Sequence, residues 1–475
     1  MKRTVSERSV CFGLIIALGF FALAMVAASS GRAAGGGPRS IPVQVSLAEA
    51  MAENEDWEEA GRRWIEILYY FGPSDQEARA EFELGAIALR RGRAGLAVSQ
   101  WQKTLSRHPD SEWAVRANQA LRLLGHEPSA APTTPAQPYI TSDTPAYERQ
   151  FLIAEGDFVQ ELYVFALRDY LKVPNSYPNS PRAAEARFRA GVCQVMLGRL
   201  DLAIQQWQRV TVEYPDSPQA GTATAAIAAW QGVLQISPVR PSEVDLEPAW
   251  RPFRSRDTEL NRGLSYAEDL YENGNFVYAL QEYAKVLCDI YTPAGEGNPH
   301  QAYARHRMGV CAYRLRRPEA AARQWRRLID THPGSPWAGH ATRALAAVGD
   351  LDGFSAEVGP LAPEVPEELP TPLLQRFHVA AQLLDCGLPE VALKEYLKVI
   401  FVLTAGNPNP FQAEAAFGVG LCHHQRGRPD LAMEAWNRVI EEYPETEWAE
   451  QATMAIARTR QCESALAQSV TPRVQ

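Results

Sequence analysis

The sequence lacks the residue patterns that most catalytic and cofactor sites require. It has only 7 cysteines, and no two of them form the CxxC arrangement of redox or zinc sites. Gly418-Val419-Gly420 has neither a preceding predicted strand nor the third glycine of a dinucleotide fingerprint. His423 and His424 are adjacent, so on a helix they point about 100° apart and do not easily share a metal. We therefore predict a protein that is not an enzyme, with no catalytic residue, no cofactor site and no metal site.

Positive charge is also scarce. The chain has 47 Lys and Arg against 56 Asp and Glu, a formal net charge of −9. An acidic chain repels phosphate backbones, and no basic stripe with interleaved aromatics offsets this repulsion. Nucleic acid is therefore not an expected partner. Hydrophobic residues make up 46% of the chain, which is enough to build cores throughout and argues against disorder of the whole chain.

Long hydrophobic runs are absent except near the N-terminus. Basic residues precede an apolar stretch from Phe12 to Met25, and Val26-Ala27-Ala28 then offers small residues for cleavage. This pattern predicts a signal peptide over residues 1–28. The alternative is an uncleaved inner-membrane anchor, because the uncharged stretch is just long enough to span a membrane. Both alternatives place the rest of the chain outside the cytoplasm, in the periplasm or secreted, since the basic end stays inside.

A four-point pattern recurs four times along the chain. Each copy has a glycine, an alanine twelve residues later, a tryptophan four residues further and a proline eight beyond that. The four sets are Gly85/Ala97/Trp101/Pro109, Gly191/Ala203/Trp207/Pro215, Gly309/Ala321/Trp325/Pro333 and Gly420/Ala432/Trp436/Pro444. A weaker alanine–aromatic copy precedes each set, at Ala60/Trp64, Ala166/Tyr170, Ala279/Tyr283 and Ala392/Tyr396. The chain is thus a two-unit module copied four times.

The physics of this pattern indicates helical hairpins. Small residues allow two antiparallel helices to approach closely, the aromatic fills the hole between neighbouring hairpins, and the proline ends the second helix. Apolar residues recur at intervals of three and four, as in Ala203, Ile204, Trp207 and Val210, which defines one helical face. A helix-start signal after each proline predicts a further helix. Each module is therefore expected to hold about five helices, the fifth capping the pair of hairpins before it.

The spacing resembles the tetratricopeptide repeat, which has Gly/Ala, Ala, aromatic and Pro positions on a 34-residue period. The resemblance covers about residues 44 to 466. It implies an all-α fold: a right-handed superhelix, or solenoid, of antiparallel helix hairpins in four modules of about five helices. The stretch from Tyr214 to Ala220 is similar to envelope repeat proteins of outer-membrane assembly and the Tol–Pal system. The resemblance therefore implies a non-catalytic protein-interaction scaffold of the bacterial cell envelope, with proteins or peptides of the envelope as partners.

Proline-rich stretches set the expected module boundaries. The predicted modules cover residues 44–125, 148–236, 258–351 and 372–467, and the predicted linkers cover residues 126–147, 237–257 and 352–371. Two arrangements remain open: the modules are separate beads, or the linkers fold back along the superhelix. Trp250 and Phe253 favour docking of the middle linker.

Three cysteines occupy the same place in their modules. Cys193, Cys311 and Cys422 each stand two residues after the repeat glycine, and we predict that they are small buried hydrophobic residues. Two disulfides within modules are the alternative, Cys288 with Cys311 and Cys386 with Cys422.

The expected binding surface is the concave face formed chiefly by the first helix of each hairpin. Phe82, Phe188, His306 and Phe417, each three residues before a repeat glycine, are the predicted partner-binding residues. They suit a groove that takes an apolar peptide or helix. The alternative is that these aromatic residues pack against the neighbouring hairpin or a linker. An alternative function also remains open, an accessory module that attaches an envelope enzyme complex to cell-wall polymer or glycan.

Overall fold

The computed structural model describes residues 40–72, 74, 76–127, 139–234, 258–292, 297–348, 371–401 and 411–470. These residues form twenty helices and no strand, which confirms the all-α prediction. Residues 1–28, Trp250 and Phe253 lie outside the described residues, so the signal peptide and the docking of the middle linker stay predictions.

The helices fall into four groups of five, which we call modules 1 to 4, as the repeat predicted. Module 1 contains α2 (Ile41–Glu53), α3 (Trp57–Tyr70), α4 (Glu77–Arg90), α5 (Ala94–Arg107) and α6 (Glu112–Leu123). Module 2 contains α7 (Ala146–Val159), α8 (Tyr163–Ser176), α9 (Ala183–Met196), α10 (Leu200–Glu213) and α11 (Pro218–Leu234). Module 3 contains α12 (Glu259–Glu272), α13 (Phe276–Leu287), α14 (Gln301–Arg314), α15 (Pro318–Thr331) and α16 (Pro336–Val348). Module 4 contains α17 (Pro372–Asp385), α18 (Pro389–Phe401), α19 (Gln412–Gln425), α20 (Pro429–Glu442) and α21 (Glu447–Val470).

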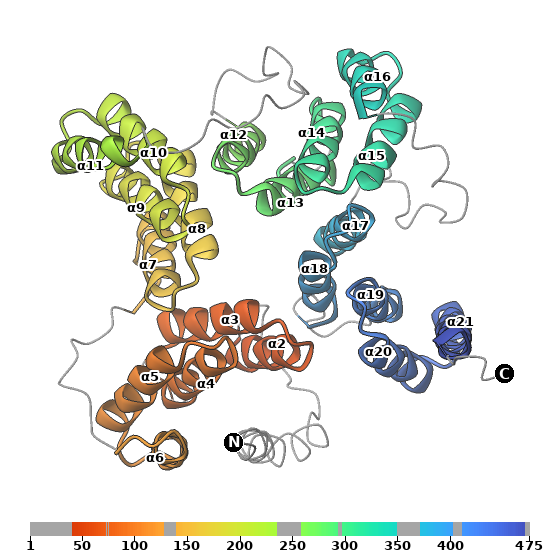
Figure 1. Cartoon of the computed structure of the whole chain (residues 1–475), viewed down its shortest axis with the longest axis horizontal. Coiled ribbons are helices and arrows are strands. Elements are labelled where there is room, and N and C mark those ends of the chain that lie inside the picture. Colours follow the sequence, from red (N-terminus) through yellow and green to blue (C-terminus); the bar gives the residue numbers. More distant parts are fainter. Residues whose placement is uncertain are drawn as a thin grey trace. The chain divides into compact units, whose positions relative to one another are not determined.

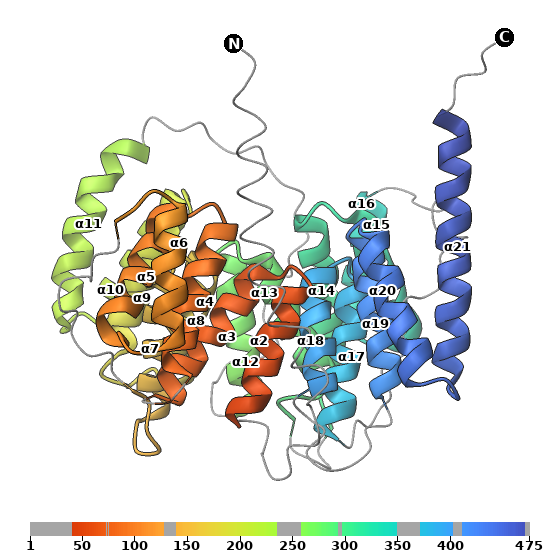
Figure 2. The ribbon, with the colours of Figure 1, turned by 90° about the horizontal axis from the view of Figure 1, so that it is seen from below.

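The chain divides into two compact units. Unit 1 contains module 1, and unit 2 contains modules 2 to 4 except Val159–Glu161 at the end of α7, which belong to unit 1. In modules 1, 3 and 4 every helix packs against the next one along the chain, and in module 2 the same holds from α8 to α11. Phe151 of α7 contacts Tyr170 of α8 with ring centroids 5.6 Å apart. In each module the fifth helix covers the second hairpin (Figure 1). Figure 2 shows α11 and α21 as such covering helices. In unit 2, α12 also packs against α8, and α17 packs against α13, so the three modules stack on one another.

Local sequence signals explain where the helices begin and turn. Ser111 caps α6, because its Oγ accepts a hydrogen bond from the N–H of Ala114 at 3.1 Å. The turn between the two helices of each second hairpin needs a residue whose backbone adopts a positive φ. Glycine supplies it in three modules, whereas module 3 uses Arg316 at φ 62°.

The repeat glycine and tryptophan meet inside each second hairpin. Every repeat tryptophan is buried, and its Nε1 donates a hydrogen bond of 3.1–3.2 Å to a backbone carbonyl of the preceding helix. A Cβ added to the repeat glycine would lie only 2.1–2.5 Å from that Nε1. The indole therefore fills space within its own hairpin and also packs against the covering helix, as Trp101 does against Leu121. This placement extends the sequence prediction, which located the aromatic only between neighbouring hairpins.

The end of the first predicted linker folds back on module 1. The N–H of Ile140 donates to the carbonyl of Tyr69 at 2.7 Å, and the Ile140 side chain is buried. The hydroxyl of Tyr139 donates to Glu77 at 2.8 Å. The second linker lies outside the described residues, and of the third linker only Thr371, the N-cap of α17, is described.

The cysteine prediction is confirmed for the three repeat positions. Cys193, Cys311 and Cys422 are buried and free, and so are Cys288 and Cys386. Neither alternative disulfide is formed. Burial raises the pKa of the Cys422 thiol well above its ordinary value, so this side chain stays neutral and packs as a small hydrophobic residue.

Candidate protein-binding surfaces

The three predicted phenylalanines lie beside the repeat tryptophans. Phe82 stacks on Trp101 with ring centroids 6.1 Å apart, and Phe188 stacks on Trp207 at 5.9 Å. Phe417 stacks on Trp436 at 6.1 Å. All three are half-buried, so each ring packs against its own hairpin and keeps an exposed part. Phe82 and Phe417 also contact Trp113 and Trp448 of the covering helices α6 and α21. The observed packing is thus within the module and not against a neighbouring hairpin or a linker, and partner binding through the exposed parts stays a prediction.

His306 takes the place of phenylalanine in module 3 and is fully buried. Its ring lies 5.9 Å from the Trp337 ring and 5.8 Å from the His340 ring. Burial, and to a smaller extent the nearby charge of Arg307, lowers the pKa of His306 to about 3, so the ring is neutral at physiological pH. A fully buried ring offers a partner no surface in this structure, which sets His306 apart from the three phenylalanines.

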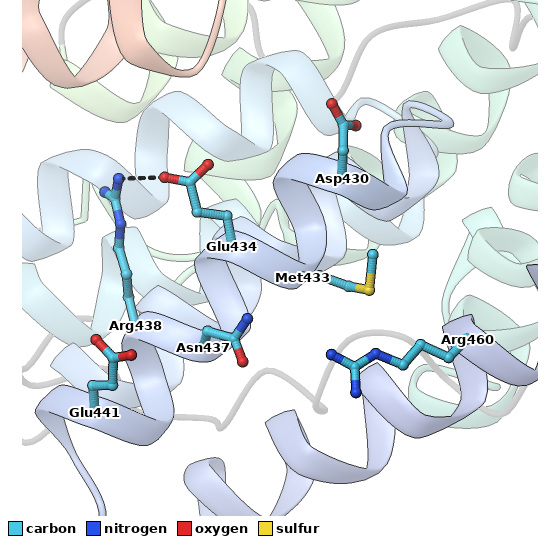
Figure 3. A pocket seen from close by; sticks show the side chains of 7 residues that line it. All are labelled: Asp430, Met433, Glu434, Asn437, Arg438, Glu441 and Arg460. Carbon is cyan, nitrogen blue, oxygen red and sulfur yellow. Dashed lines mark hydrogen bonds and ion pairs between the residues drawn. The ribbon is translucent and has the colours of Figure 1, made fainter.

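A polar groove of about 550 Å³ lies between α20 and α21 (Figure 3). It is lined by Asp430, Met433, Glu434, Asn437, Arg438, Glu441 and Arg460. The polar lining residues of α20 lie on the face opposite the buried Ala432, Trp436 and Val439, whereas Met433 packs against these core residues. Arg438 donates to Glu434 at 2.8 Å within this face. The groove therefore offers carboxylates and guanidinium groups suited to a polar protein surface. The repeat pattern did not point to these residues, because it records only inward-facing positions.

Buried ion pairs join modules 2 and 3. Asp269 on α12 is buried and accepts hydrogen bonds from Arg187 at 3.3 Å, from Asn175 at 2.6 Å and from Arg209. Burial alone would raise the pKa of the Asp269 carboxyl, but Arg187 and Arg209 outweigh burial and lower this pKa below its ordinary value. The carboxylate is therefore ionised and holds the first helix of module 3 against module 2.

The junction of modules 3 and 4 uses the same kind of contact. Asp385, the last residue of α17, is fully buried and accepts from Arg323 at 3.1 Å and from Gln324 at 2.8 Å. Arg327 lies 3.6 Å from the same carboxylate. A second buried contact runs from Gln281 on α13 to Glu395 on α18 at 2.8 Å. Because each carboxylate is matched by several donors, the modules of unit 2 are fixed in register as well as in contact.

One group of side chains in unit 1 has the geometry of metal ligands. Oxygen and nitrogen atoms of Glu77, Glu81 and His108 lie within 4.8 Å of one another. Arg107, however, donates to both carboxylates, and Lys103 lies 3.3 Å from Glu81. The guanidinium group thus already supplies the positive charge between the carboxylates. We interpret the group as an ion-pair network that also holds Tyr139 of the first linker.

A raised carboxyl pKa between α19 and α21 gives a pH prediction. Burial, together with the charge of Glu447, raises the pKa of Glu414 from 4.5 to about 7. The folded state then holds a proton that the unfolded state has lost, so stability falls as pH rises from 4.5 through 7. We expect Glu414→Gln to raise the melting temperature at pH 8 and to have little effect at pH 4. Melting curves at the two pH values, with Glu450→Gln on the exposed face of α21 as control, check this; an equal shift at both pH values would contradict it.

Comparison with known proteins identifies the repeat. One family model described as tetratricopeptide repeat matches residues 160–218 and 383–445, and a second of the same description matches residues 303–335. Modules 2, 3 and 4 therefore contain tetratricopeptide repeats. No curated protein matches the chain.

Two solved structures align over most of the chain at low similarity. The crystal structure of the APC/C hetero-tetramer Cut9-Hcn1 is 10% identical and covers 88% of this chain and 83% of that chain, with a TM-score of 0.17. A circular tandem repeat protein with novel repeat topology is 12% identical and covers 90% and 98%, with a TM-score of 0.18.

Proposed function

We propose that this chain is a non-catalytic scaffold of the bacterial cell envelope that binds other proteins through its helical-hairpin surfaces. The observation that carries the proposal is the stack of modules in unit 2, fixed by the buried carboxylates of Asp269 and Asp385. A stack of repeats in a fixed register presents a long preformed surface, so little ordering entropy is lost when a partner binds. The half-buried phenylalanines supply apolar contacts, and the groove of module 4 supplies charged ones.

The envelope location is supported by the sequence. The basic residues and apolar stretch before residue 28 suit a signal peptide, and cleavage after Ala28 would release the repeats into the periplasm. Within the part of the chain that the structure describes, no helix is both long and apolar enough to cross a bilayer. Intact-mass analysis of the protein recovered from the periplasm tests the location. We expect a chain beginning at residue 29, and an uncleaved chain in the membrane fraction would favour the anchor instead.

Capture of partners in intact cells tests the scaffold. We propose crosslinking of cells that express a C-terminally tagged chain, followed by affinity purification and mass spectrometry. A small and reproducible set of envelope proteins that survives digestion of the cell wall is the expected result. Recovery only with wall fragments, and without protein partners, would overturn the scaffold and favour attachment to wall polymer.

The predicted apolar contacts are tested with the captured partner. Replacing Phe82, Phe188 and Phe417 together by leucine keeps apolar volume beside the tryptophans but removes three aromatic rings. We expect the partner's Kd to rise at least about tenfold, because aromatic residues dominate binding energy at interfaces. Val212→Ser removes an apolar side chain that is 77% exposed on α10, and it serves as the control. An unchanged Kd in a well-folded triple variant would show that the three rings serve packing alone.

A further inference from the structure

Two positions that recur in every module hold histidine only in module 3. The residue three before the repeat glycine is His306 on α14 in module 3 and phenylalanine in the other modules. The residue seven after the repeat proline is His340 on α16 in module 3, and it is Arg116, Thr222 and Gln451 in the others. Both departures from the repeat therefore fall in one module, one on a hairpin helix and one on the covering helix.

The two histidines meet where α16 covers α14. Their ring centroids lie 5.8 Å apart, and their ring planes cross at 72°. Trp337 packs against both, with its ring centroid 5.9 Å from that of His306 and 5.4 Å from that of His340. The two imidazoles are thus neighbours inside the contact between the hairpin and its covering helix.

The imidazole of His306 has unused hydrogen-bonding capacity. Its side chain is fully buried, and among the described residues neither of its ring nitrogens has a hydrogen-bond partner. A neutral imidazole has one N–H donor and one acceptor nitrogen, so both groups are left unsatisfied. Burying them costs stability that the phenylalanine of the other modules does not lose. A buried polar group of this kind points to a bound ion or water.

His340 can supply a second nitrogen at the same place. It is half-buried, and its Nδ1 lies 3.1 Å from Nη2 of Arg343, one turn further along α16. Arg343 is exposed, so its side chain can move into solvent and leave this nitrogen for another ligand. Arg307, the other arginine beside His306, is paired with Glu268 at 2.8 Å, which offsets its positive charge.

We propose that His306 and His340 bind a zinc ion between α14 and α16, with water completing its coordination. Neutral imidazole is a preferred ligand of zinc. Two imidazoles that each place a nitrogen about 2 Å from a shared zinc ion have ring centroids about 5–6 Å apart, and the observed separation is 5.8 Å. The ion ties the covering helix of module 3 to its second hairpin. Because only two side chains coordinate it, the ion exchanges with the solution.

This assignment departs from the prediction that the chain has no metal site. The sequence offers His423 and His424 as its adjacent pair, and these two do not easily share a metal. His306 and His340 come together only because α16 packs against α14. The spacing of the histidines in the sequence does not indicate that contact.

Zinc-dependent stability of the full chain tests the proposal. Thermal unfolding of the metal-free chain is followed by circular dichroism with and without zinc. Magnesium, which prefers oxygen ligands, is the metal control. We expect saturating zinc to raise the Tm by at least about 3 °C, because the unfolded chain does not hold the two histidines together. Isothermal titration calorimetry should show a saturable site for one zinc ion per chain.

Substitutions separate binding of the ion from packing. His306→Phe keeps a ring at this position, as in the other modules, so we expect the chain to fold and the zinc effect to be lost. His340→Gln should weaken zinc binding at least about tenfold, and Arg343→Gln should strengthen it about threefold because a nearby positive charge is removed. His424→Gln, at an exposed histidine beside Trp436, serves as the control and should leave the zinc effect unchanged.

Two results would overturn the proposal. If zinc raises the Tm of the parent chain and of His306→Phe equally, the ion binds elsewhere on the chain. If zinc neither binds nor stabilises the parent chain, a buried water and not an ion satisfies the ring nitrogens of His306.

Discussion

Replacing Asp269 by alanine is expected to destabilise unit 2 by about 3 kcal/mol, because it leaves a buried arginine without its main counter-charge. Arg187 is fully buried, and its Nη1 lies 3.3 Å from the Asp269 carboxylate. Its other neighbours, Gln206 at 3.1 Å and Glu213 at 3.2 Å, compensate only in part. Urea unfolding followed by circular dichroism should show the loss at the junction of modules 2 and 3.

A surface ion pair provides the control for this prediction. Asp430→Ala removes a carboxylate that pairs with Arg428 at 3.2 Å but is 64% exposed, so we expect a change of no more than about 1 kcal/mol. Replacing Asp269 by leucine together with Arg187 by methionine removes both buried charges and should recover most of the stability. If Asp269→Ala and Asp430→Ala lower the free energy of unfolding equally, the buried charges do not stabilise the junction of modules 2 and 3 as proposed.

The hairpins and their number could be predicted because their signals are local. Glycine, alanine, tryptophan and proline stand within 24 residues of one another in each copy, and each has a steric reason to be there. The structure places the tryptophan over the glycine as this spacing requires, for example Trp207 against Gly191. Five helices per module followed from the start signal after each proline.

The contacts between modules could not be predicted. The residues that form them are far apart in the sequence and do not stand at positions of the repeat pattern. Asp269 binds Arg187, which is 82 residues away in the sequence, and Asn175, which is 94 residues away. Nothing in the spacing distinguishes Asp269 from the many acidic residues on solvated helix faces. Its role depends on how α12 packs against α8, and a single sequence does not reveal that packing.

The candidate binding residues show the same limit. The sequence placed Phe188 and His306 at equivalent positions, and the structure confirms the equivalence, since each backbone carbonyl accepts from its repeat tryptophan. The two side chains differ in exposure because Trp337 and His340 of α16 surround His306 in module 3. The tryptophan four residues after the repeat proline recurs as Trp113 and Trp448, which contact Phe82 and Phe417, whereas module 2 has Gln219 there. Exposure therefore depends on a covering-helix position that the four-point pattern does not include.

Replacing Gly309 by valine is expected to destabilise unit 2 by about 3 kcal/mol, because it overpacks the closest helix contact in module 3. A Cβ at Gly309 would lie 2.3 Å from Nε1 of Trp325, whose side chain is fully buried and hydrogen-bonded to the His306 carbonyl. The indole ring is rigid and enclosed, so α14 and α15 must separate, and the Nε1 hydrogen bond is lost with them. Thermal unfolding followed by circular dichroism measures the effect.

We expect the loss of stability because the added side chain clashes with Trp325, and not because glycine is lost. Gly309→Ala should therefore cost much less stability when Trp325 is also replaced by leucine, because the smaller side chain leaves room for the added methyl group. A Cβ added to Gly339 on α16 would meet no atom within 4 Å, so Gly339→Ala should stabilise the helix by about 0.5–1 kcal/mol. If Gly309→Ala lowers the free energy of unfolding and Gly339→Ala raises it, the repeat glycine is required for close packing of the helices. Equal effects in the Trp325 and Leu backgrounds would refute that assignment and point to the backbone of α14 instead.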